Sequence, residues 1–390
     1  MDNSKVIIKS GNINAWIFGG SLSQSNGATV IEGNSSVEIS GGTISGQVFG
    51  GSYGWDADTS TFQATVKGDT SVKLTGGTVT GYVFGGSRTD SDQYRGGSNA
   101  NIYGNTTVEI SDNAFVDGDV FGGSVVYMAY SGDSAEANIS GSTNIVMNGG
   151  SVSGNILAGS YIENNIEGKT AEGSIHSANI TISKGEIGGD IYAGGFGAGS
   201  KIEEDSKVKF IGNSSDINFT GTVYGGGENG AIIGGKSKVA FGDSENAFVG
   251  AFQGSINKFD ELLVENENTN VALEKAFDVS VLRVDSLSQI SLVDGSSFGE
   301  LNIIFNDKDF DEGSVLNFDL GEIFGDGKSI VLSVIEGESG LTLTNSSGQT
   351  FAANYSNDSF EVLHLIPEPS CFALLFGMLT MGFALYRRHK

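Results

Sequence analysis

The chain repeats itself, and this repeat restricts the possible folds more than any other feature of the sequence. Residues 28–52 read ATVIEGNSSVEISGGTISGQVFGGS, and residues 63–87 read QATVKGDTSVKLTGGTVTGYVFGGS, so the two segments align over 25 residues without a gap. Residues 99–124 contain a third copy with one inserted residue, NANIYGNTTVEISDNAFVDGDVFGGS. Self-similarity with a period of roughly 20–50 residues is typical of solenoids and propellers, in which each repeat is one structural unit.

Each unit shows three short runs of β-favouring residues separated by turn residues. In the best-defined unit these runs are residues 29–31, 37–39 and 43–49. Valine, isoleucine and threonine favour strands, and glycine pairs between the runs allow sharp corners. Gly85 and Gly86, for example, are predicted to occupy a corner conformation that a Cβ atom would strain. The polar, variable segments that follow, such as residues 53–62 and 88–98, are interpreted as loops.

Three strands and three corners make one coil, and stacked coils would pair like strands at about 4.8 Å. One coil cannot bury its apolar face alone, so several coils must stack. The sequence therefore predicts an all-β protein, a parallel β-helix (solenoid) of about seven coils. A β-propeller is the alternative, but its blades have four strands, and the unit here has three and no Trp-Asp signature.

One position of the repeat holds an aromatic residue or leucine. It recurs at intervals of 31, 35, 37, 36, 35 and 32 residues, as Phe18, Phe49, Phe84, Phe121, Leu157, Tyr192 and Tyr224. Each follows a β-branched residue that alternation assigns to the interior, so these side chains, the aromatic ladder, are expected to point outward. Three arrangements stay open: the rings lie under side loops in a second small core, they turn inward at a corner, or they form an exposed stripe that stacks on sugars or on a second solenoid.

The repeat pattern changes near residue 250, where glycines become rarer and the alternation of apolar residues lengthens. We expect three regions: a β-solenoid repeat domain over residues 1–250, degenerate coils and a β-rich capping module over 251–365, and a tail over 366–390. A cap is expected because an open solenoid end is an unpaired sheet edge.

Composition excludes several classes of protein. The chain has 60 glycines but only 2 prolines, which excludes collagen and argues against disordered linkers. Its formal net charge of −26 makes nucleic acid an unfavourable partner. The one cysteine, Cys371, allows no internal disulfide bond.

The last residues form a membrane-directed sorting tail. Both prolines of the chain are here, in Pro367, Glu368 and Pro369, and an apolar run of 16 residues, 371–386, precedes Arg387 and Arg388. The run is at the short edge of the ~17–25 residues that span a bilayer as a helix, and the basic end predicts a cytoplasmic C-terminus.

This tail resembles the PEP-CTERM signal of bacterial exported proteins. The resemblance implies processing by a membrane protease-transpeptidase of the exosortase type, with the C-terminal transmembrane helix in the inner membrane before cleavage. It implies an exported protein of the cell envelope or cell surface. Residues 6–227 also loosely resemble the Gly-Gly-rich repeats of bacterial surface and autotransporter-like proteins. Residues 1–8 do not have the order of a signal peptide, so we expect a misplaced start or a longer protein.

The search for chemistry predicts no catalytic residues, no cofactor and no enzyme. The three histidines form no ligand-spaced pair. Carboxylate pairs that could support polysaccharide cleavage lie in or beside the variable segments, as Asp56 with Asp58, Asp90 with Asp92, and Asp117 with Asp119, near Arg88 and Arg95. Near-identical coils argue instead for a scaffold, because a catalytic site is normally unique along a solenoid.

The best metal candidate is the alternating run of Asp307, Asp309 and Asp311, whose carboxylates could converge on Ca²⁺. An EF-hand loop would need glycine at position 312 and glutamate at 318, where this chain has Glu312 and Phe318. A solvated acidic turn is therefore the preferred interpretation, and no metal site is predicted.

The function predicted from the sequence is that of a non-enzymatic exported structural protein of the cell surface or extracellular matrix, sorted and cleaved at its tail. An adhesin that binds glycans or host surfaces is the first alternative, with extracellular polysaccharide as its partner. A polysaccharide lyase or hydrolase is the second.

Overall fold

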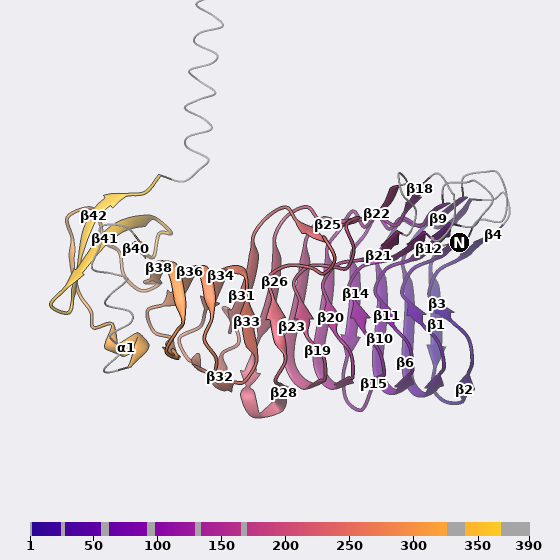
Figure 1. Cartoon of the computed structure of the whole chain (residues 1–390), viewed down its shortest axis with the longest axis horizontal. Coiled ribbons are helices and arrows are strands. Elements are labelled where there is room, and N and C mark those ends of the chain that lie inside the picture. The colour runs from indigo at the N-terminus through magenta and orange to yellow at the C-terminus, as the bar shows by residue number, and fades with distance from the viewer. Residues whose placement is uncertain are drawn as a thin grey trace, which may run out of the picture.

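The computed structural model of the chain describes residues 2–24, 28–55, 62–91, 98–128, 134–164, 170–325 and 340–367. Almost all regular structure in these residues is β-strand, and the strands of successive repeats lie side by side along one long axis (Figure 1). The all-β prediction is confirmed. We call one set of consecutive strands that stacks on the equivalent set of the next repeat a coil.

The longest strands of the coils form one side of the stack, which we call the long-strand sheet. Its strands are β1 (Ser4–Ile8), β2 (Asn12–Ile13), β6 (Ser35–Ile44), β10 (Thr70–Val79), β14 (Thr106–Ile110), β15 (Phe115–Val116), β19 (Thr143–Val152), β23 (Ala178–Ile187), β26 (Ser206–Phe210), β28 (Ile217–Phe219), β31 (Ser237–Phe241), β34 (Phe259–Val264), β36 (Asp278–Asp285), β38 (Ser297–Ile304) and β40 (Leu341–Thr344). A four-stranded sheet of β27 (Gly212–Asn213), β32 (Phe248–Phe252), β35 (Asn270–Leu273) and β37 (Gln289–Ser291) continues the stack.

A second side of the stack carries the aromatic ladder, and we call it the ladder sheet. Among the described residues it has eight strands: β3 (Ile17–Phe18), β7 (Val48–Phe49), β11 (Val83–Phe84), β16 (Val120–Phe121), β20 (Ile156–Leu157), β24 (Ile191–Tyr192), β29 (Thr222–Tyr224) and β33 (Ser255–Asn257). The seven predicted ladder positions occupy the first seven strands in register, and β33 places Asn257 beside Tyr224.

The variable segments are interpreted as loops from the sequence, but each of them begins and ends with a β-strand. They form two further sheets, which we call the arm sheets. One contains β4 (Leu22–Gln24), β8 (Tyr53–Trp55), β12 (Arg88–Ser91), β17 (Val125–Met128) and β21 (Tyr161–Asn164). The other contains β5 (Thr29–Ile31), β9 (Phe62–Val66), β13 (Ser98–Asn99), β18 (Ser134–Glu136), β22 (Thr170–Ile175), β25 (Ser200–Ile202) and β30 (Ile232–Ile233).

Pairing between coils is parallel and residue-for-residue. Val37 of β6 lies beside Val72 of β10, which lies beside Val108 of β14. A propeller blade instead pairs neighbouring strands of one repeat, so this pattern argues against the propeller alternative. It is compatible with the predicted β-helix.

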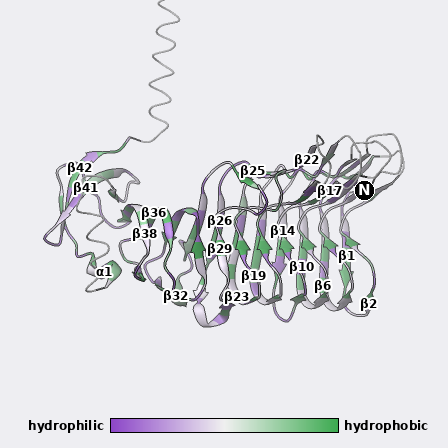
Figure 2. Cartoon of the chain, viewed as in Figure 1, coloured by the Kyte–Doolittle hydropathy of each residue, from purple (hydrophilic) through white to green (hydrophobic). Residues whose placement is uncertain are grey.

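The main core runs along the inside of the stack and consists of apolar residues, chiefly Val, Ile, Leu and Phe, that recur from coil to coil. Alternate residues of β6 and β10 are buried, as the period of two requires. Ile44 and Val48, which alternation assigned to the interior, are both fully buried. Hydrophobic residues therefore recur at the same height of each strand along the stack (Figure 2).

The C-terminal end of the stack changes its pairing direction. Parallel pairing continues past residue 250 and ends with β40 on β38. From β40 the chain turns back into antiparallel β41 (Thr350–Ser356) and β42 (Ser359–Leu365), and β39 (Val315–Asn317) pairs with β42. The short helix α1 (Gly321–Phe324) lies in the same module, at the left of Figure 1. Phe305, Phe318 and Phe360 pack edge-on or stacked in its core.

No helix in the described part of the chain is long and apolar enough to cross a membrane. The transmembrane helix expected over residues 371–386 lies outside the described residues and stays a prediction.

Candidate functional site

The aromatic ladder is the most regular side-chain arrangement of the molecule. Phe18, Phe49, Phe84 and Phe121 stack face to face, with ring centroids 4.7, 4.9 and 4.9 Å apart. Tyr192 and Tyr224 continue the stack beyond Leu157 with a centroid distance of 4.8 Å. The spacing matches that of paired strands, so coil stacking itself places the rings in contact.

The ladder is a second core, separate from the main one. Phe49 and Phe84 both have an exposed fraction of 0 %, and they cluster with Phe121, Val125 and Leu157. Phe49 and Phe84 therefore do not belong to an exposed stripe of rings. Stacking of sugars needs accessible ring faces, so the ladder offers no such surface at these coils.

Residues from the first arm sheet and from the turn before the ladder cover these rings. Tyr53 of β8 stacks on Phe18 with a centroid distance of 5.1 Å, and Tyr161 of β21 meets Phe121 edge-on at 5.5 Å. Tyr82 lies edge-on to both Phe84 and Phe121. The cover is thus made by strands of the first arm sheet and by a turn residue of the coil itself.

Arg88 holds the cover together at the N-terminal coils. Its Nε donates to Asp90 Oδ2 at 3.0 Å, its Nη2 forms an ion pair with Asp90 Oδ1 at 3.0 Å, and its Nη1 donates to Gln47 Oε1 at 3.0 Å. The guanidinium carbon lies 4.3 Å from the centre of the Trp16 ring. Only 12 % of the Arg88 side chain and 15 % of the Asp90 side chain are exposed, so the pair is largely shielded from water.

Tyr53 completes this cluster, because its hydroxyl donates to Asp90 Oδ2 at 2.7 Å. Burial raises the pKa of Tyr53 well above its usual range, and the adjacent Asp90 carboxylate raises it further. Tyr53 therefore stays a neutral donor in any ordinary buffer. A carboxylate held by an arginine fork and a tyrosine hydroxyl is the arrangement of a structural ion pair rather than of a general acid or base.

Of the other predicted carboxylate pairs, Asp117 with Asp119 is described, and each of its carboxylates bonds to the following coil. Asp117 Oδ1 accepts from the Ser153 hydroxyl at 2.9 Å, and Asp119 Oδ1 accepts from the Asn155 N–H at 2.7 Å. Burial raises the pKa of Asp119, partly offset by the Asn155 N–H. Each carboxylate therefore links its coil to the next one. Asp56, Asp58, Asp92 and Arg95 lie outside the described residues.

Of the calcium candidates, Asp309 has side-chain partners other than a metal ion. Asp309 accepts hydrogen bonds from the hydroxyls of Ser346 and Ser347 at 2.7 and 3.0 Å, and these bonds lower its pKa. The Asp311 N–H donates to Ser314 Oγ at 3.1 Å. Within the described ranges, no group of three or more His, Cys, Asp or Glu side chains is arranged to hold a metal ion.

Polar side chains repeat along the stack as well. The hydroxyls of Ser52, Ser87, Ser124 and Ser160 are fully buried, and each accepts from the N–H of the equivalent serine one coil earlier at 3.0–3.2 Å. Asparagine and aspartate carbonyl oxygens do the same at another turn, where Asn34, Asp69 and Asn105 accept from the next coil at 2.7–2.9 Å. The serine bonds satisfy backbone donors in the interior, and the asparagine and aspartate bonds satisfy exposed ones at the corners.

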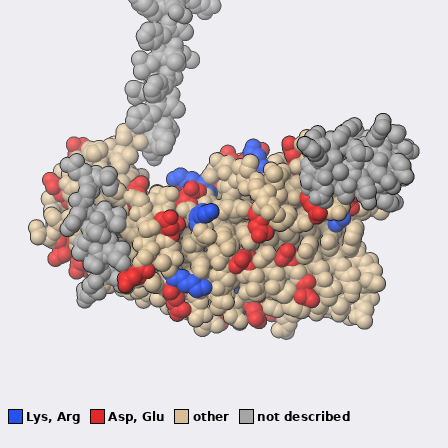
Figure 3. All heavy atoms as spheres, viewed as in Figure 1, with Lys and Arg blue, Asp and Glu red and all other residues tan. Residues whose placement is uncertain are grey.

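The surface charge is dominated by acidic groups. They are spread over the face shown in Figure 3, and basic groups gather at a few places. Several lysines of β26 and β31 bond to acids of neighbouring coils, as Lys207 with Glu265 at 3.1 Å and Lys238 with Asp205 at 2.6 Å. These lysines therefore join coils.

Of the sorting motif, the structure describes Pro367 alone, which is exposed just after β42. Glu368, Pro369, Arg387 and Arg388 lie outside the described residues.

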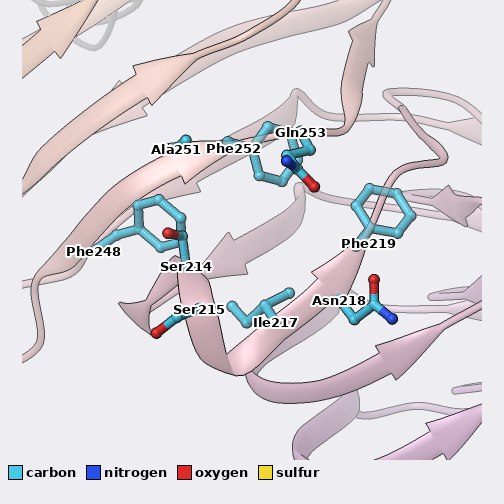
Figure 4. Close-up of a pocket in the computed structure, with 9 residues that line it drawn as sticks. All are labelled: Ser214, Ser215, Ile217, Asn218, Phe219, Phe248, Ala251, Phe252 and Gln253. Atoms are coloured by element: carbon cyan, nitrogen blue, oxygen red, sulfur yellow. The ribbon is translucent and has the colours of Figure 1, made fainter.

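Sequence reasoning missed one hollow of about 350 Å³ on the stack (Figure 4). It lies between the short 3₁₀ turn η1 (Ser214–Asp216) with β28 on one side and β32 on the other. Its lining residues are Ser214, Ser215, Ile217, Asn218, Phe219, Phe248, Ala251, Phe252 and Gln253. The insertion of four residues between two strands could have signalled the hollow. The arm of the same coil is shorter, so the total repeat length does not show the insertion.

No protein-family model matches the chain, and no curated protein or solved structure shows significant similarity to it. Function is therefore argued from the molecule alone.

Proposed function

We propose that the chain is a non-enzymatic structural protein, a parallel β-helix scaffold that is exported and sorted through its PEP-CTERM-like tail. One observation carries the scaffold part of the proposal. The aromatic, serine and asparagine positions of each coil contact the same positions of the next coil, so the side chains that repeat serve the stacking of the coils.

The electrostatics support a scaffold over an enzyme. The best candidate for chemistry, Asp90, is engaged by Arg88 and Tyr53, and Asp117 and Asp119 each bond to the following coil. Polysaccharide cleavage needs one carboxyl group that gives a proton and another that accepts one or attacks. These three carboxylates are already committed to structural bonds.

The adhesin alternative loses its original site, because the rings at Phe49 and Phe84 are buried. Surface or matrix localisation rests on the tail and on the acidic, polar exterior. An acidic exterior keeps a long solenoid soluble and repels its own copies.

The sorting part can be tested in the native host. Surface protein would be isolated and its C-terminus mapped by mass spectrometry. We expect a mature chain that ends near Pro367–Pro369 and lacks the apolar run. Recovery of surface protein that still ends at Lys390 would refute the sorting route, and the scaffold assignment would be unaffected.

The scaffold part has its own test. Purified protein would be incubated with neutral and acidic bacterial polysaccharides, and new reducing ends and unsaturated products would be measured. We expect no turnover. Turnover that the Asp90→Asn variant abolishes would instead assign an enzyme.

A further inference from the structure

The hollow beside η1 has a structural origin in the length of one turn. Between register partners of the main core, the earlier coil needs three residues to go from Ile182 to Gly185, whereas the next coil uses seven to go from Phe210 to Ile217. The longer turn contains the five residues of β27 and η1. As a result, β27 pairs with β32 of the next coil, whereas β28 pairs with β23 of the preceding coil.

This arrangement opens the stack locally. In the part of the chain that the structure describes, β28 has no strand paired on its forward edge. The opening is closed at both ends, by the Gly212 N–H bonded to the Ala247 carbonyl at 2.7 Å and the Ser255 N–H bonded to the Gly221 carbonyl at 2.9 Å. The hollow is therefore a window between two coils that ligands reach from outside.

Two glycines beside the window have no room for a Cβ atom. A Cβ atom on Gly250 would lie 2.1 Å from Ser214 Oγ, and one on Gly254 would lie 2.5 Å from a ring carbon of Phe219. The floor is apolar, because Phe219 and Phe252 belong to the main core. The rim is polar: Ser215, Asn218 and Gln253 are exposed, and Figure 4 shows side chains from both segments around the space.

A shallower trough of about 470 Å³ adjoins the window and shares Ser215 and Asn218 with it. A column of register partners, one per coil, runs along this trough: Phe115, Ser151, Glu186 and Asn218. Three coil steps at about 4.8 Å give a length of roughly 14 Å. Phe115 at the far end is 36 % exposed, so an aromatic ring is accessible there.

The chemistry of window and trough selects among ligands. The floor rings Phe219 and Phe252 are only 3 % and 4 % exposed, so the accessible aromatic face is that of Phe115 in the trough. Together with the hydroxyl and amide groups of the rim, this ring suits a ligand with hydroxyls at its edges and C–H groups on its faces. The window is lined by no ionisable side chain, and the trough adds Asp112, Glu186 and Asp216 against Lys184, so anionic ligands are repelled. A peptide strand cannot thread the window, since bonds close both of its ends.

We propose that the window beside η1 and the adjoining trough bind a neutral oligosaccharide. This site is separate from the aromatic ladder and does not rest on the scaffold or sorting proposals. It would give the scaffold one defined point of contact with a neutral polysaccharide.

The test uses the full chain and isothermal titration calorimetry with cellohexaose and maltohexaose as neutral probes and hexagalacturonate as the anionic probe. At least one neutral probe should bind with a Kd of about 1 mM or tighter, and the anionic probe should not bind. Asn218→Ala and Gln253→Ala should each weaken binding about three- to tenfold, as expected for one lost hydrogen bond. The control Asn268→Ala changes an exposed asparagine outside both hollows and should leave Kd unchanged.

Hydrogen exchange locates the site independently of the variants. Saturating neutral probe should slow exchange at residues 212–221 and 248–254 and leave the ladder strands unchanged. Failure of both neutral probes to bind, tighter binding of hexagalacturonate, or protection confined to other coils would each overturn the proposal.

Discussion

The rings of Phe49 and Phe84 lie parallel within 2°, with centroids 4.9 Å apart, and neither ring is exposed. They occupy the same position of successive coils, and their strands pair Val48 with Val83 and Phe49 with Phe84. Register and ring stacking therefore reinforce each other, because a one-residue slip would exchange the ladder side chains with those of the main core.

We expect Phe84→Ala to lower the free energy of unfolding by about 3–5 kcal/mol, as is usual for a fully buried phenylalanine. Phe84→Leu should cost less, because Leu157 already fills the equivalent position two strands further along the ladder sheet. Urea unfolding checks both variants. Tyr103→Ala removes a ring that is 60 % exposed and serves as the control, with a change within about 0.5 kcal/mol. Equal losses for Phe84→Ala and Tyr103→Ala would contradict the ladder's role as a core.

The repeat predicted the positions of the ladder, but not what covers it. Alternation places Phe49 on the side opposite Val48, and this follows from the backbone period of two. The cover comes from the arm sheets, whose strands YGW, RTDS, VVYM and YIEN share almost no sequence. Parallel pairing uses backbone groups, so strands can stack without similar side chains, and a search for self-similarity finds only loops there.

The window was missed for a related reason. The coil that contains η1 has four extra residues at one turn, yet the interval between Tyr192 and Tyr224 is one of the shortest. The arm of that coil is shorter, which hides the insertion in the total length. A repeat of ordinary length can therefore contain a coil with a different shape.

Gly86 is required for a different reason than the corner strain that the sequence suggested. Neither Gly85 nor Gly86 adopts positive φ, in contrast to Gly77 at +81°. A Cβ atom on Gly86 would instead lie 2.2 Å from Ser124 Oγ and 2.8 Å from the Gly123 carbonyl oxygen of the next coil. Close approach of coils, rather than a special dihedral angle, excludes a side chain.

Gly86→Ala should therefore destabilise the protein by about 1–3 kcal/mol, as overpacking of a tight contact does. Gly226 supplies a matched control at the same position of a later coil, since a Cβ atom there meets nothing within 4 Å. Gly226→Ala should change the stability by no more than about 0.5 kcal/mol. Thermal unfolding of the two variants decides the matter, and a similar loss for both would reject coil contact as the cause.

Asp243 should make the stability depend on pH at the acid end. Burial raises its pKa, but the hydrogen bond from Lys209 Nζ at 2.5 Å, with bonds from the N–H groups of Glu245 and Asn246, lowers the pKa to about 2. The value in the unfolded chain is about 3.9. Since the folded value is the lower one, this contribution to stability is complete above about pH 4 and is lost as pH falls toward 2.

Urea midpoints measured between pH 2 and 5 test this dependence. Wild-type protein should lose stability more steeply below pH 4 than Asp243→Asn, and the difference between the two should shrink toward pH 2. Lys209→Met removes the main partner and should flatten the slope in the same direction. If Asp243→Asn and wild type fall in parallel over the whole range, Asp243 is not the group that titrates.

Arg88 gives the last prediction, because it joins the cover of the ladder to two neighbouring coils. Arg88→Ala removes the fork on Asp90 and the stacking on Trp16 while Asp90 stays mostly buried, so we expect a loss of about 2 kcal/mol or more in urea unfolding. The control is Lys67→Ala, which breaks an ion pair with Glu32 whose side chains are about half exposed and which should cost less than about 1 kcal/mol. The double variant Arg88→Met with Asp90→Asn removes both charges together and should recover part of the loss. A double variant no more stable than Arg88→Ala would mean that packing on Trp16, and not the buried charge of Asp90, accounts for the effect.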